Sequence, residues 1–269
     1  MTQMAEETRE GWALATFTIA FFIFLIAPIL VVVAVSFTSV SYVSFPIQGF
    51  SLRWFWRIVE YRPFLDALGV TIQVAFLSTA LAVLIGVPSA LALVRSRGSF
   101  AEIAMTFLLS PLSMPMIVLG LALLFYLSAL GLGISLISLV IAHTVIGLPY
   151  VVRTVAGVYR GMSPDLEESA TMLGADRWQV LRYVTLPQVR PGVFAGALFS
   201  ILISIDNLPI SFFFGSPSTN TLPVVMLSYL EHQFDPSIAA LSTVQMILAL
   251  VGLLIIERFY GLRYLGAPT

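Results

Sequence analysis

Acidic side chains within the apolar stretches of this sequence are rare, and Asp206 is the clearest one. It is the only acid well inside a predicted span, 191–213, where it stands beside Asn207. An ionised carboxylate attracts cations, and placing one near the centre of a membrane helix costs at least ~2.5 kcal/mol. Asp206 and Asn207 therefore predict a site on the path of a cationic solute. A helix end lifted into the outer interface, or a hydrogen bond to a neighbouring helix, would also explain Asp206.

Hydrolytic and metal chemistry have little support. The chain has no Cys and only two His, and it contains neither His-Glu-x-x-His nor Gly-x-Ser-x-Gly. It also lacks the Gly-x-x-x-x-Gly-Lys-Ser/Thr loop that holds nucleotide phosphates. We therefore predict no catalytic residue and no metal site. His143, Gln73 and Gln245 are expected to be interhelical hydrogen-bond partners rather than ligands.

A polar segment, 163–187, carries the start and stop signals of a short helix. Ser163 is a good N-cap, Pro164 suits the first helical position, and three acids follow in the first turn, where the helix dipole favours negative charge. Gly174 is expected to end this helix in a left-handed conformation, which only glycine adopts at little cost.

A second helix is predicted directly afterwards, running toward Pro187. Asp176 would be its N-cap, and Gln179 could complete a capping box. The apolar side chains of each helix share one face. They are Leu166, Ala170 and Leu173 in the first helix and Trp178, Leu181 and Val184 in the second. Such faces need a cover, which is either the chain's own bundle or a partner protein.

The same segment resembles the coupling motif of the permease subunits of binding-protein-dependent ABC importers. That motif is Glu-Ala-Ala, three residues, Gly, nine residues, then Ile-x-Leu-Pro. Here it reads Glu168-Ser169-Ala170, Gly174 and Val184-Thr185-Leu186-Pro187, with both spacings kept and two small changes of side-chain size. The resemblance covers about residues 66–260.

Within that family the sequence looks most like the second permease of polyamine (spermidine/putrescine) importers. Residues 50–54, 111–115 and 221–223 carry this likeness. These stretches are less specific, because importers of iron, thiamine, sulfate or phosphonate have similar ones.

The resemblance implies a type I ABC importer permease fold and a docking loop for a separate ATPase. It implies a partner ATPase dimer that holds ATP and Mg, a second homologous permease and an extracytoplasmic solute-binding protein, with no cofactor on this chain. The residues expected to couple to the ATPase are Glu167, Glu168, Ser169, Ala170, Leu173, Gly174, Ala175, Leu186 and Pro187.

These sites must be carried by membrane helices. The 269 residues are 59% hydrophobic and 10% charged, whereas about a quarter of a typical soluble domain is charged. Residues 103–152 have no charge, and one helix of that length would be roughly 75 Å long, so the run must turn back near Gly131. An all-α integral membrane protein of about six transmembrane helices is predicted, as a single domain, 12–269. The predicted spans are 12–36, 66–94, 102–129, 135–156, 191–213 and 237–257, with a coupling loop at 157–190 and an N-terminal tail at 1–11.

The distribution of Arg predicts the orientation, since cytoplasmic loops carry the basic excess. With the N-terminus inside, Arg53, Arg57 and Arg62 lie outside, and all other Arg residues lie on the cytoplasmic side. Both termini are therefore expected in the cytoplasm, with the chain in the bacterial inner membrane. The net charge of −1 gives no reason to expect nucleic acid. A secondary carrier or channel stays open as an alternative, although the spans carry few charges.

Overall fold

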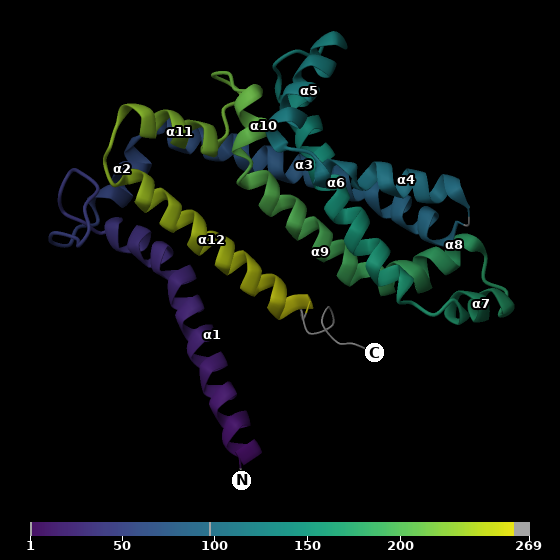
Figure 1. Ribbon diagram of the computed structural model, residues 1–269. Coiled ribbons are helices and arrows are strands. Elements are labelled where there is room, and N and C mark those ends of the chain that lie inside the picture. The colour runs from purple at the N-terminus through teal and green to yellow at the C-terminus, as the bar shows by residue number, and fades with distance from the viewer. Residues whose placement is uncertain (1, 97, 261–269) are drawn as a thin grey trace. The chain divides into compact units, whose positions relative to one another are not determined.

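The computed structural model describes residues 2–96 and 98–260, and every regular element in these residues is helical (Figure 1). The predicted all-α fold is confirmed. The chain divides into two compact units. The first comprises the residues up to Arg62 together with Tyr229–Gly252, and the second comprises Pro63–Ser228 together with the segment from Leu253 onward.

The first unit contains α1 (Thr2–Val35), α2 (Arg53–Glu60), the end of α11 (Leu222–His232) and most of α12 (Ser237–Tyr260). The segment between α1 and α2 is not helical, as predicted, and α2 holds it in place. Trp54 Nε1 donates a hydrogen bond of 2.8 Å to the carbonyl of Thr38, and the Arg53 guanidinium lies 4.2 Å from the centre of the Trp54 ring.

The second unit contains the functional segment and is built around α6. Its elements are α3 (Arg62–Arg95), α4 (Ser99–Leu109), the 3-10 turn η1 (Ser110–Ser113), α5 (Met116–Ala129), α6 (Leu136–Arg160), α7 (Asp165–Met172), α8 (Arg177–Val180), the π-helical turn η2 (Leu181–Thr185), α9 (Leu186–Ile205) and α10 (Leu208–Phe213). Val151, Val152 and Val155 of α6 are completely buried. Two apolar clusters pack along this helix, one near each of its ends.

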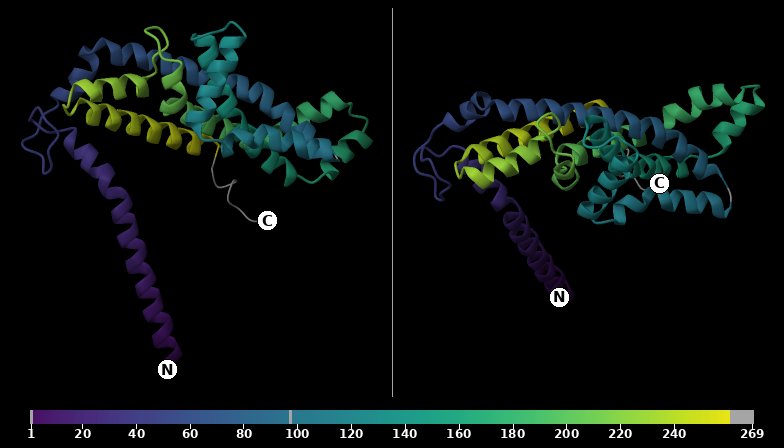
Figure 2. Two further views of the ribbon diagram at one scale, coloured as in Figure 1. Left: turned by 45° about the horizontal axis from the view of Figure 1, so that its top comes forward. Right: turned by 90° about the horizontal axis from the view of Figure 1, so that it is seen from above.

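Close packing of α9 on α6 depends on two glycines of α9. A Cβ at position 196 would lie 2.7 Å from Val151 Cα, and one at position 192 would lie 2.9 Å from the carbonyl oxygen of Thr154. No side chain fits in either place, so Gly192 and Gly196 let the two backbones approach, as small residues do in many membrane helix pairs. Figure 2 shows α6 and α9 side by side in both views.

A helix needs about 20 apolar residues to span a membrane. In the part of the chain that the structure describes, four segments are long and apolar enough to span a membrane: Leu14–Val35, Arg62–Arg95, Leu136–Arg160 and Arg177–Ile205. The pair Ser99–Ser113 and Met116–Ala129 makes a fifth if it is counted as one span, and Ser237–Gly252 is a shorter apolar helix. Each of the six predicted spans falls mainly on one of these segments, and their boundaries in a membrane stay predictions.

The predicted span 102–129 is broken into two helices. The chain bends there by 112° between α4–η1 and α5. Pro111 lies in the first turn of η1, and Pro115 precedes α5. Proline has no N–H to donate and disfavours the helical conformation of the residue before it, so this pair interrupts the helix.

Two further boundaries differ from the prediction. The second helix of the polar segment does not stop at Pro187, because α8, η2 and α9 form one run from Arg177 to Ile205. In η2 the Leu186 N–H donates to the carbonyl of Leu181, five residues back, and Pro187 continues the helix without an N–H. The expected span 191–213 instead ends at Ile205, and α10 begins separately at Leu208.

Candidate functional site

The segment with the coupling-motif pattern forms a compact pair of helices, α7 and α8, beyond the end of α6 (Figures 1 and 2). Ser163 Oγ accepts a hydrogen bond of 3.3 Å from the N–H of Asp165 at the start of α7. Gly174 has φ +91, which confirms the predicted left-handed conformation between the two helices. The capping box at Asp176 and Gln179 is also confirmed, with both of its hydrogen bonds at 2.8 Å.

Glu167 holds α7 onto the rest of the unit through three side chains from three elements. Its Oε1 accepts hydrogen bonds from the Tyr159 hydroxyl of α6, at 2.9 Å, and from the Thr185 hydroxyl of η2, at 2.6 Å. Its Oε2 lies 3.2 Å from a guanidinium nitrogen of Arg95, the last residue of α3. One carboxylate thus ties α7 to the ends of α3 and α6 and to the start of the α9 run.

The Arg95 guanidinium reinforces this junction, because it also lies 4.5 Å from the centre of the Tyr159 ring. A cation over an aromatic face is favourable by about 0.5–1 kcal/mol at partly exposed sites. Arg95 and Glu167 form an ion pair, and their side chains are 34% and 20% exposed. The charge on Glu167 is thus matched within the chain.

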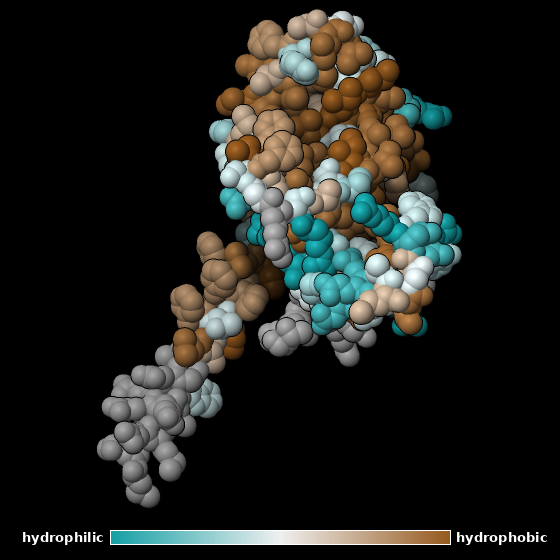
Figure 3. All heavy atoms as spheres, turned by 90° about the vertical axis from the view of Figure 1, so that its right-hand side faces the viewer, coloured by the Kyte–Doolittle hydropathy of each residue, from teal (hydrophilic) through white to brown (hydrophobic). Residues whose placement is uncertain are grey.

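Glu168, by contrast, is exposed, as are Met172 (89%) and Leu173 (90%) at the end of α7. Glu167, Glu168, Thr171 and Met172 line a shallow depression on this surface. Figure 3 views the molecule from this side and shows hydrophilic residues gathered there. The exposed polar ones on this loop include Asp165, Glu168, Arg177, Gln179 and Arg182. Its surface therefore combines an acidic side chain with uncovered apolar ones.

The apolar faces expected on the two helices are only partly covered by the chain itself. Leu166, Leu173 and Trp178 are exposed, whereas Ala170, Leu181 and Val184 are half-buried. The chain's own bundle thus leaves much of these faces open.

The expected coupling residues fall into two groups. Glu168, Ser169, Leu173 and Gly174 are exposed, and Glu167, Ala170, Ala175, Leu186 and Pro187 are half-buried. Leu186 packs against the apolar cluster at the end of α6. The first group can meet a partner, and the second group joins the loop to the bundle.

Asp206 and Asn207 occupy the break between α9 and α10. Asp206 does not lie inside the helix expected at 191–213, because it is the C-cap of α9, which ends at Ile205. It is exposed, whereas Asn207 is buried and its Oδ1 accepts a hydrogen bond of 3.0 Å from the Ile210 N–H at the start of α10. Asn207 is therefore a helix cap, and of these two residues Asp206 is the one with an exposed side chain.

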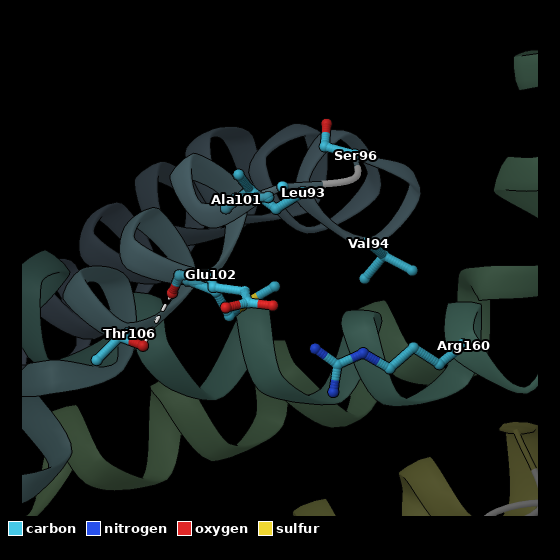
Figure 4. Close-up of a pocket in the computed structure, with 9 residues that line it drawn as sticks. Leu93, Val94, Ser96, Ala101, Glu102, Thr106 and Arg160 are labelled. Atoms are coloured by element: carbon cyan, nitrogen blue, oxygen red, sulfur yellow. Dashed lines mark hydrogen bonds between the residues drawn. The ribbon is translucent and has the colours of Figure 1, made fainter.

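A cavity of about 520 Å³ lies beside the functional segment, where α3 ends, α4 begins and α6 ends. Glu102 of α4 and Arg160 of α6 point toward one another across it (Figure 4). No ion pair joins these two described side chains. Arg95, Tyr159 and Glu102 were not predicted as functional residues, and nothing in their spacing along the sequence would have connected them.

The chain matches the family described as binding-protein-dependent transport system inner membrane component over residues 82–262. It is 32% identical to the spermidine/putrescine transport system permease protein PotC of Escherichia coli (strain K12) over 235 residues, which are 87% of this chain and 89% of PotC. It is 30% identical to the putrescine transport system permease protein PotI of the same strain over 252 residues, which are 91% of this chain and 88% of PotI.

Another relative has a different solute in its name. The molybdenum transport system permease protein ModB of Mycobacterium bovis is 32% identical over 250 residues, covering 86% of this chain and 93% of ModB. Among solved structures, a bacterial ABC transporter that imports the acidic polysaccharide alginate contains a similar chain, with TM-score 0.70, 16% identity and coverage of 93% of this chain and 96% of that one. The fold is thus that of an ABC importer permease, and the chain belongs to the family of inner membrane components of binding-protein-dependent transport systems.

Proposed function

We propose that this permease is driven by a separate ATPase that docks on α7 and α8. The observation that carries the proposal is that one part of α7 is bound within the chain and another part is exposed. Glu167 is bound to Arg95, Tyr159 and Thr185 within the chain, whereas the apolar end of the same helix is uncovered. A partner that grips Met172 and Leu173 would therefore move α3, α6 and α9 through Glu167.

The ATPase would be a dimer that holds ATP and Mg, since this chain has no phosphate loop of its own. A second, homologous permease would complete the translocation pathway, and an extracytoplasmic binding protein would deliver the solute. Closure of the ATPase dimer would displace the docked helices and drive the change between inward-open and outward-open states.

The docking surface can be tested by replacing Met172 and Leu173 with Ser. Burying one such side chain contributes roughly 1.5–3 kcal/mol. In mild detergent, the double variant is therefore expected to co-purify with about one tenth of the normal amount of ATPase subunit, or less. Met114, which is 41% exposed between η1 and α5, provides the control, and Met114→Ser should retain the ATPase normally. Unchanged retention in the double variant would show that the ATPase docks elsewhere.

For the solute we propose a small organic polycation of the polyamine class. PotC and PotI are named as polyamine permeases, and the exposed carboxylate of Asp206 would attract ammonium groups. Iron, thiamine, phosphonate and sulfate stay as alternative solutes, and ModB is named for molybdenum. The secondary carrier that the sequence left open does not agree with the family match over residues 82–262.

Asp206→Asn distinguishes a cationic solute from an anionic one, because it removes the charge of this side chain and keeps its shape. For a polyamine solute, we expect the KM for uptake to rise about twofold to fivefold in proteoliposomes that contain the assembled importer, since one exposed charge pair contributes up to about 1 kcal/mol. Asp176→Asn is not a suitable control, because Asp176 is a helix cap. Glu102→Gln is suitable, since Glu102 is exposed on α4, outside the α7–α8 loop and away from the break. An unchanged KM in Asp206→Asn would remove Asp206 from the solute path.

A further inference from the structure

The interruption between α9 and α10 has two long backbone hydrogen bonds and one short one. The Asp206 N–H reaches the carbonyl of Leu202 at 3.3 Å, and the Asn207 N–H reaches that of Ser204 at 3.5 Å. The Leu208 N–H donates to the carbonyl of Asp206 at 3.0 Å, a bond within the break itself. Two residues outside the helical conformation leave backbone groups without helical partners, so a joint of this kind bends easily unless side chains hold it.

His143 of α6 spans this interruption. Its Nδ1 lies 2.7 Å from the hydroxyl of Ser204, in the last turn of α9, and its Nε2 lies 3.0 Å from the hydroxyl of Ser211, in α10. His143 and Ser211 are completely buried, and Ser204 is 3% exposed. A neutral imidazole has one donor and one acceptor nitrogen, and a hydroxyl can play either part, so both contacts are satisfied in either tautomer.

The two serines stand on opposite sides of the break, and one rigid ring binds both. The α10 side has a second support, since a Cβ at Gly120 of α5 would lie only 2.9 Å from the Phe213 ring. The α9 side also has one, since Ser204 lies 3.5 Å from the Ser78 hydroxyl of α3. These supports tie each half-helix to an additional neighbour, while both halves also pack on α6. The His143 ring adds a buried polar contact to each half.

We infer that His143 is a positioning residue that locks the break between α9 and α10 into a rigid elbow and so fixes where Asp206 is presented. Asp206 lies between the two serines that His143 binds, and it is exposed while they are buried. The elbow is a property of the chain alone. Its effect on uptake rests on the proposed role of Asp206 in the solute path.

Hydrogen exchange measures the elbow without reference to transport. In the purified importer complex, Ser211→Ala is expected to speed amide exchange in residues 206–214 by about threefold to tenfold, the range for losing one buried interhelical hydrogen bond. His143→Leu, which loses both contacts, should speed it by at least as much. Ser211→Ala should add no further increase in the His143→Leu background, because both changes break the same contact. His143→Gln, whose amide can reach about as far as Nε2, should restore slow exchange in part.

Thr79→Val is the matched control. It removes a buried hydrogen bond of 3.0 Å between α3 and α9, from Thr79 to Ser200, which does not span the break. Exchange in 206–214 should stay as in the unmodified protein. Equal loosening by Thr79→Val, or unchanged exchange in both His143→Leu and Ser211→Ala, would overturn the elbow.

Uptake gives the second measurement. With Asp206 in the solute path, Ser211→Ala should raise the KM for a polyamine severalfold and leave ATPase stimulation within about twofold of the unmodified protein. Faster exchange with an unchanged KM, together with an unchanged KM in Asp206→Asn, would reject the solute path and leave the elbow standing. Faster exchange with an unchanged KM, when Asp206→Asn does raise the KM, would overturn the positioning role.

Discussion

Neighbouring acids on α7 have opposite surroundings. Glu167 has three partners on three elements, whereas Glu168 is exposed. The motif resemblance aligns Glu168 with the motif acid, yet Glu167 is the residue that joins α7 to the bundle. Sequence reasoning placed both in the coupling set and could not assign them different parts, because Arg95, Tyr159 and Thr185 are brought together only by the fold.

The two acids should therefore give different phenotypes when neutralised. Glu167→Gln keeps the size of the side chain but converts charge-assisted hydrogen bonds into neutral ones, which are roughly half as strong. We expect a severalfold fall in uptake with normal retention of the ATPase subunit, because the link to Arg95 is weakened and the docking surface is intact. Glu168→Gln should instead lower retention of the ATPase. Identical behaviour of the two variants in co-purification and uptake would contradict this division.

At the break between α9 and α10, the sequence predicted that a charged residue is important but not that it lies at a helix end. Asp206 was expected inside a span because it is the one charge in the apolar stretch 191–213, and a helix end was the alternative. The structure shows Asn207 capping α10 through Ile210. An Asn followed by a short apolar run is a cap signal as well as a polar residue in a membrane helix, and the sequence alone does not separate the two.

At the level of elements, caps were predictable because they depend on neighbours in sequence. Asp176 and Gln179 form the expected capping box, and Gly174 has the expected positive φ. Elements that depend on distant packing were not predictable in the same way. The continuous run through Pro187 needs the π-helical turn η2, and the hydrogen bond from Thr185 of that turn to Glu167 is a tertiary contact.

The turn between α7 and α8 can be tested by a pair of glycine substitutions. At Gly174 (φ +91) an added Cβ meets no atom within 4 Å, so Gly174→Ala is opposed by backbone conformation alone, at about 1–2 kcal/mol. A Cβ at Gly157 of α6 likewise meets nothing, and this glycine is helical, so Gly157→Ala should be tolerated. We expect uptake and ATPase stimulation to fall severalfold in Gly174→Ala only. Equal activities of the two variants would show that the turn does not need its left-handed residue.

In the second unit, the same three helices contribute to the junction at Glu167 and to the contacts beside the break. α3, α6 and the α9 run provide the partners of Glu167 at one end. Further along, Ser78, His143 and Ser204 of these helices form the polar contacts beside the break. Between them, Gly192 and Gly196 bring α9 against α6 so closely that the pair cannot slide without a clash. This continuity suits a unit that carries a displacement of α7 to the solute path as a rigid body.

Orientation in the membrane is the remaining property of the whole molecule, and the chain offers a simple test because it has no Cys. Ser96, at the end of α3, and Ser218, after α10, are both exposed, and Ser→Cys hardly changes side-chain size. The Arg distribution puts Ser96 in the cytoplasm and Ser218 outside. A membrane-impermeant maleimide should therefore label Ser218→Cys in intact spheroplasts and Ser96→Cys only in inverted vesicles. Labelling of Ser96→Cys in spheroplasts would reverse the topology and place α7 and α8 on the side of the membrane that has no ATP.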